Sequence, residues 1–152
     1  MSTQAIAGAA AGAALLGGGG TLAAYAAGAF NKDDYFNKAK RGLTDKEYIA
    51  DQEDNMKKWL IQKDKEIDYK KNLKDNISSM TGVVGSTAPE STKVDKLQGD
   101  TPPTEQEAKE IYDYTKAWCE SKKNAVYNDA DGQNKQEFER FKKVCFVTKI
   151  AV

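Results

Sequence analysis

Apolar residues of this 152-residue chain begin in one dense block and then thin out into a helical pattern. Residues 5–30 are almost all Ala and Gly with a few larger apolar side chains, and no charged residue occurs before Lys32. A helix over this range would be about 39 Å long, and a bilayer core is about 30 Å thick. The block predicts an N-terminal hydrophobic helix, residues 1–31, that contacts membrane lipid through residues 5–30.

Two other interpretations of this block stay open. Ala24-Tyr25-Ala26 and Ala27-Gly28-Ala29 both have the small-x-small pattern of a signal-peptide cleavage site. Residues 17–20 are four glycines, which oppose helix formation, and no basic side chain precedes the block. The alternatives to an anchor are therefore a cleaved signal peptide, which would leave a secreted protein, and an Ala/Gly-rich tail on a soluble protein.

The body, residues 32–152, begins with a connector and a long sparse stripe of apolar residues. Thr44 and Glu47 have the spacing of a capping box, which marks a helix start. Lys63 and Lys70 interrupt the seam that a coiled coil would need. We therefore expect a single amphipathic helix over residues 44–80 that packs on a neighbour, within a segment 32–80. Its apolar positions are Ile49, Met56, Leu60, Ile67, Leu73, Ile77 and Met80.

Residues 81–103 are rich in Ser, Thr, Gly and Pro, and this composition predicts a flexible linker. Thr104 and Glu107 form a second capping box before the best apolar face in the chain, and a last helix carries Phe138, Phe141 and Val144. Residues 104–152 thus predict a helical hairpin whose tail either prolongs the last helix or forms a short strand. The predicted fold class is all-α.

Cys119 and Cys145 are the only cysteines. A disulfide between them would contribute about 3.5 kcal/mol in the chain-entropy model. In a plain antiparallel hairpin they would be misaligned by about 10 Å, whereas a disulfide needs Cα atoms within about 7 Å. A crossed packing or an unwound tail after Val144 would close that gap. The sequence leaves two outcomes, a disulfide and two buried thiols.

Charge and composition exclude several classes of protein. Lys and Arg together number 23, as do Asp and Glu, so the body lacks the basic excess that nucleic-acid binding requires. There is no histidine, which removes the commonest general base and metal ligand. Asp129, Asp131 and Gly132 suggest a calcium loop, but Tyr127 and Phe138 would occupy its first and last ligand positions. We predict no catalytic, cofactor-binding or metal site, no small-molecule substrate and no enzymatic activity.

The side of the membrane on which the body lies is left open. Five basic residues between Lys32 and Lys46 follow the apolar block and none precedes it, which the positive-inside rule associates with a cytoplasmic body. A cleaved signal peptide would instead place the body outside the cell.

The charge-free N-terminus, the polar helical body and two short cysteine motifs resemble a known group. These motifs are Lys116-Ala117-Trp118-Cys119-Glu120 and Lys142-Lys143-Val144-Cys145. The chain is similar to the paralogous families of uncharacterised proteins in haemotropic mycoplasmas, and the likeness covers the N-terminal segment and roughly the last 45 residues. The resemblance implies a membrane-anchored or surface protein that contacts the host, and it assigns no activity to any residue.

Together these observations predict a single-pass protein of the cell membrane with a surface or interaction role and a protein partner. The alternatives are a secreted or soluble helical binding module and, less favoured without histidine or a catalytic motif, a small enzyme.

Overall fold

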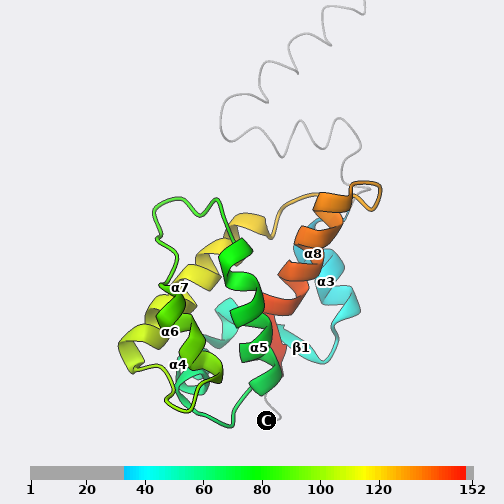
Figure 1. The fold of residues 1–152 in the computed structure, drawn as a ribbon. Coiled ribbons are helices and arrows are strands. Elements are labelled where there is room, and N and C mark those ends of the chain that lie inside the picture. The colour runs from blue at the N-terminus through cyan, green and yellow to red at the C-terminus, as the bar shows by residue number, and fades with distance from the viewer. Residues whose placement is uncertain (1–32, 150–152) are drawn as a thin grey trace, which may run out of the picture. The chain divides into compact units, whose positions relative to one another are not determined.

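The computed structural model describes residues 33–149. All of these except Asp33 belong to one compact unit, Asp34–Val152. The expected N-terminal hydrophobic helix, with its alternatives, lies outside the described residues. The described part is mostly helical, as predicted, with one small two-stranded sheet (Figure 1). Its α-helices are α3 (Tyr35–Gly42), α4 (Glu53–Ile61), α5 (Ile67–Asn76), α6 (Ser91–Asp95), α7 (Glu105–Lys122) and α8 (Gly132–Val144). The strands are β1 (Lys46–Tyr48) and β2 (Phe146–Thr148), and short 3-10 helices are η2 (Ile49–Gln52), η3 (Ile77–Ser79) and η4 (Lys96–Gln98).

The single long helix expected over residues 44–80 is wrong, and its start is a strand. Residues after Thr44 form β1, which pairs antiparallel with β2 so that Tyr48 lies opposite Phe146. The two rings lie 5.6 Å apart, and both side chains are buried. Aromatic pairs across strands stabilise a sheet. This distant partner, which a local capping pattern does not reveal, overrides the helix signal at Thr44 and Glu47.

The expected helix is also broken in its middle. α4 ends at Ile61, and the chain then turns through Glu66, which has a left-handed backbone with φ of 47°. Lys70 is 2% exposed, and its Nζ donates hydrogen bonds to the carbonyls of Gln62 (2.6 Å) and Lys63 (3.0 Å). Gln62 is the C-cap of α4 and Lys63 follows it, so both carbonyls lie in the turn that leaves the helix. Lys70 therefore fixes the turn between α4 and α5.

The segment 81–103, expected to be a flexible linker, is folded over residues 91–98, so that expectation is wrong there. It forms α6 and η4, and these bury Val94 and Leu97. η4 packs against α5, and Lys96 Nζ lies 2.6 Å from Glu107 Oε1 on α7. Val94 and Leu97 are three positions apart, so they lie on one face of these helical turns and are buried together.

The prediction for the start of α7 is confirmed. Glu107 N donates to Thr104 Oγ1 (3.3 Å), and Thr104 N donates to Glu107 Oε2 (2.8 Å), which completes the capping box. The tail after α8 takes the second of its two expected forms and becomes the strand β2. The predicted apolar face of α7 is buried: Ala108, Ile111, Tyr112, Thr115, Trp118 and Cys119.

α7 and α8 do not stand alone as a hairpin. α7 packs on α4, α8 packs on α5 and α3, and all these elements contribute to a shared apolar core. A C-terminal hairpin of this size has too few apolar residues to be stable by itself, and contact with the preceding helices supplies the missing burial. Within residues 33–149 no helix has the length and hydropathy needed to cross a bilayer.

Candidate functional site

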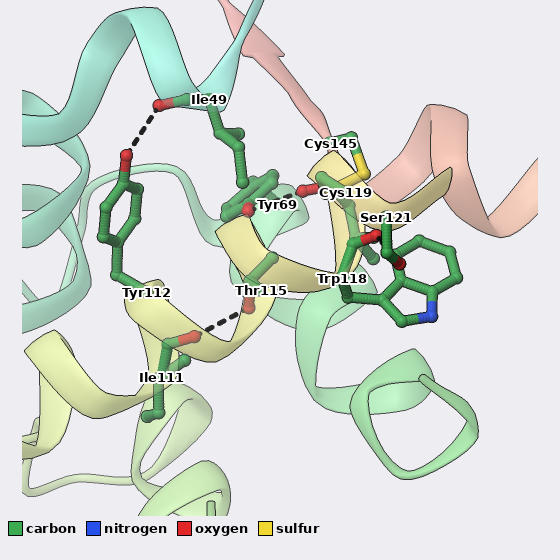
Figure 2. Close-up of a disulfide and its surroundings, with 10 residues drawn as sticks. Ile49, Tyr69, Ile111, Tyr112, Thr115, Trp118, Cys119, Ser121 and Cys145 are labelled. Atoms are coloured by element: carbon green, nitrogen blue, oxygen red, sulfur yellow. Dashed lines mark hydrogen bonds between the residues drawn. A yellow bond between two sulfur atoms is a disulfide. The ribbon is translucent and has the colours of Figure 1, made fainter. Parts of the chain in front are cut away.

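The cysteine pair lies at the centre of the core and is bonded as a disulfide. Cys119 near the end of α7 and Cys145 directly after α8 have Cα atoms 5.7 Å apart, and both are fully buried (Figure 2). α8 ends at Val144, so Cys145 has left the helix. The unwound tail removes the misalignment expected for a plain hairpin. Among the described residues there is no free cysteine, so the pair acts as a covalent crosslink in the core.

Buried tyrosine hydroxyls around the disulfide bind backbone carbonyls of distant elements. Tyr69 Oη donates to the carbonyl of Val144 at 2.8 Å, and Tyr112 Oη donates to that of Ile49 at 3.1 Å (Figure 2 shows the second bond). On α3, Tyr35 Oη donates to the carbonyl of Asn134 at 2.9 Å. Burial raises the pKa of all three phenols above the usual value. They remain protonated near neutral pH, so they act as structural donors rather than as acid–base groups.

Lys70 is the one charged residue buried among the described residues, and its role is structural. Burial lowers the pKa of its ammonium group. A lysine with a lowered pKa is sometimes a catalytic base, but this one makes its hydrogen bonds to the loop carbonyls of Gln62 and Lys63. The geometry accounts for Lys70 without any chemistry on a substrate.

A groove of about 550 Å³ lies beside β1. Volumes of this order are typical of small-ligand sites. Phe36, Tyr48 and Phe146 contribute rings to it, and Phe36 lies 5.1 Å from Tyr48. Its other lining residues include Lys40, Lys46, Lys149, Glu47 and Asp51.

The groove lacks the arrangement of a catalytic site. Glu47 accepts a hydrogen bond from Gln52, and Lys149 Nζ donates to the carbonyl of Thr44 at 2.7 Å. Lys40 Nζ lies 5.6 Å from the centre of the Phe36 ring. These groups are held by their neighbours and do not converge on one point in the groove. Sequence patterns do not reveal this groove, because Phe36 and Tyr48 meet the third ring, Phe146, which lies about a hundred residues later in the chain.

Carboxylates elsewhere on the described surface serve ion pairs and helix caps. Glu53 accepts hydrogen bonds from Lys116 Nζ (2.7 Å) and Lys57 Nζ (2.6 Å), and these bonds lower the pKa of Glu53 to about 2. Asp131 Oδ1 accepts from Gln133 N (2.9 Å) and caps α8, which gives the apparent calcium-loop sequence a structural role. Across residues 33–149 no group of three or more His, Cys, Asp or Glu residues is placed to hold a metal ion.

The start of α3 is fastened to the α7–α8 loop, residues 123–131. Asp34 forms an antiparallel bridge with Val126, and Tyr35 N donates to the carbonyl of Ala125 at 2.8 Å. Phe36 N donates to the carbonyl of Lys123 at 3.0 Å. These bonds fix the position at which the chain passes from its N-terminal segment into the folded unit.

Comparison of the chain with protein-family models, curated proteins and solved structures finds no match in any of the three.

Proposed function

We propose that this chain is a membrane-anchored surface protein whose body lies outside the cytoplasm and acts by binding a partner. The observation that carries the proposal is the Cys119–Cys145 disulfide at the centre of the core. Structural disulfides form and persist in oxidising compartments and are rare in the reducing cytosol. The bond therefore favours an extracytoplasmic body over the cytoplasmic one that the basic residues after Lys32 suggest.

The chemistry of the body supports binding over catalysis. The buried tyrosines bind backbone carbonyls, Lys70 fixes a turn, and Asp131 caps a helix. The groove beside β1 has a volume in the range of small-ligand sites. The apolar block at residues 5–30 supplies the proposed single-pass anchor.

Membrane fractionation and protease shaving of intact cells that express the full chain test this proposal. We expect the protein to stay in the membrane after carbonate washing and the folded unit to be released by protease added outside. Mass measurement without a reducing agent should then find the released unit lighter than its reduced form by two hydrogen atoms. A protease-resistant body with free thiols would contradict the extracytoplasmic placement.

Soluble recovery after carbonate washing, with a new N-terminus near Ala27 or Phe30, would favour the secreted binding module instead. Retention of the initial Met1 segment in the membrane fraction would exclude that alternative. A mass measurement of the N-terminal peptide distinguishes a chain that retains its first residues from one that begins near Ala27 or Phe30. One preparation therefore decides between an anchored and a secreted protein.

A further inference from the structure

The loop 81–90, between η3 and α6, carries neither helix nor strand and leaves its middle open to solvent (Figure 1). Val84 is 98% exposed, whereas Val126, the valine exposed in the α7–α8 loop, is 41% exposed. Gly82 and Gly85 on either side of Val84 have positive φ of 79° and 75°, and no atom beyond their chain neighbours lies within 4 Å of the place where a Cβ would stand. Both glycines therefore have open space from which a second protein can approach the chain.

The ends of this loop are held by buried residues. Met80 is fully buried, and its carbonyl accepts a hydrogen bond from Tyr114 Oη on α7. On the other side of the loop, Val94 is buried in α6. Within the loop Val83 is half-buried and packs against the core. Extension of the loop would displace Val83 and leave Met80 and Val94 in the core.

An open loop of this kind is the form in which a folded protein is cut by a protease. An endoprotease binds its substrate as an extended chain, so exposed loop tips with small residues are preferred sites of cleavage. The Val84–Gly85 bond follows a small branched aliphatic side chain, which proteases of the elastase type recognise. Val126 is less accessible, because it pairs with Asp34 in a β-bridge and its carbonyl accepts a hydrogen bond from Asn134 Nδ2 at 2.9 Å.

A cut at this loop would leave two chains that share one core. Cys119 and Cys145 both lie after the cut, so the disulfide does not join the two chains. Noncovalent contacts join them instead: β1 pairs with β2, α4 packs on α7, and α5 packs on α8. The buried bond from Tyr69 Oη to the carbonyl of Val144 also connects the first chain to the second.

We propose that the Val84–Gly85 bond is a cleavage site in the folded protein for endoproteases whose pocket takes a small branched aliphatic side chain, and that the two resulting chains stay joined through the shared core. Water adds across the peptide bond, which leaves a carboxylate on Val84 and an ammonium group on Gly85. The site lies within the folded unit, so it does not depend on the anchor proposed at residues 5–30.

Limited digestion of the full chain in mild detergent with pancreatic elastase tests the proposal. The readout is the fragment that begins at Gly85, which cuts in the Ala-rich residues before Lys32 do not produce. We expect this fragment to appear well before the fragment that begins at Tyr127. Val84→Asp should slow its formation at least about tenfold, because an apolar pocket would have to desolvate a carboxylate. Thr87→Asp, which adds the same charge at an exposed position of the same loop, should change the rate by less than about threefold.

The cut protein should elute as one species in gel filtration in the same detergent. In denaturing electrophoresis without a reducing agent it should separate into two bands, since both cysteines lie after the cut. Equal rates of cleavage after Val84 and Val126, or an unchanged rate in Val84→Asp, would overturn the cleavage site. Separation of the two chains in gel filtration without denaturant would overturn the joined product.

Discussion

Tyr69 illustrates how single polar atoms hold this small protein together. Its ring is buried against the core, and its hydroxyl donates to the carbonyl of Val144, at the last residue of α8. A carbonyl at a helix end has no partner inside the helix. The bond therefore closes α8 at the residue before the disulfide.

Replacement of Tyr69 by Phe removes this donor and retains the ring. Because the carbonyl of Val144 is left buried without its donor, we expect the free energy of unfolding to fall by about 1–3 kcal/mol. Urea denaturation followed by circular dichroism measures the change. Tyr127→Phe is the matched control, since the Tyr127 side chain contributes ring contacts in the described structure, and it should lie within about 0.5 kcal/mol of the wild type. Equal effects of both variants would argue against the helix-closing role of Tyr69.

The cap of α8 is a second contribution at this scale. Asp131 Oδ1 accepts from Gln133 N and from Asn134 N, at 2.9 Å and 3.2 Å. Asp131→Ala should lower the free energy of unfolding by about 1 kcal/mol, the usual cost of a lost N-cap. Asp129→Ala in the same loop serves as the control and should leave the free energy of unfolding nearly unchanged. Urea denaturation followed by circular dichroism measures both variants. A loss of stability with Asp129→Ala alone would contradict the assignment of the cap.

At the scale of elements, sequence patterns succeed where the signal is local and fail where the partner is distant. The spacing of Thr104 and Glu107 predicts the start of α7 correctly because the capping box is complete within four residues. The same spacing at Thr44 and Glu47 misleads, since β1 is defined by pairing with β2 some hundred residues later. Local patterns do not predict the groove beside β1 for the same reason, because Phe146 meets Phe36 and Tyr48 only in the folded chain.

The segment that contains α6 and η4 gives a direct test of a folded element in place of a linker. Leu97 is 3% exposed, and its element packs on α5. Leu97→Ala should lower the free energy of unfolding by about 2–5 kcal/mol, as expected for a large-to-small change in a core. Val84→Ala, in the exposed loop of the same segment, should change it by less than about 0.5 kcal/mol. Urea denaturation measures the free energy of unfolding of both variants. If Leu97→Ala leaves it unchanged, the segment is better described as the flexible linker that its composition predicts.

At the scale of the whole molecule, buried phenols make stability depend on alkaline pH. Burial raises the pKa of Tyr35, Tyr48, Tyr69 and Tyr112 in the folded state above the value of 10.0 taken for a free side chain. Each phenol is neutral when protonated, so above that pH the unfolded chain loses these protons before the folded chain does. The contribution of these groups is complete below pH 10 and decreases as the pH rises above it.

We therefore expect a cooperative alkaline unfolding transition, in which tyrosinate absorbance appears together with the loss of helical circular dichroism. Tyr69→Phe removes one of these ionising groups. The slope of the free energy of unfolding against pH should therefore become shallower in this range by the contribution of one proton. Tyrosinate absorbance that rises fully near pH 10 while the helical signal is unchanged would show that the phenols ionise without unfolding and would contradict the prediction.

The pairing of β1 with β2 also bears on how the protein is made. Tyr48 cannot reach its partner until Phe146 has been synthesised, and α3 cannot be fastened until Val126 is available. Contacts between segments so far apart in sequence slow folding, because a long loop must close before they stabilise anything. During biosynthesis β1 and the start of α3 therefore cannot form their native pairings until the last third of the folded unit has been made. If the body is extracytoplasmic, as we propose, late pairing of these strands would keep the core open until the whole chain has been translocated.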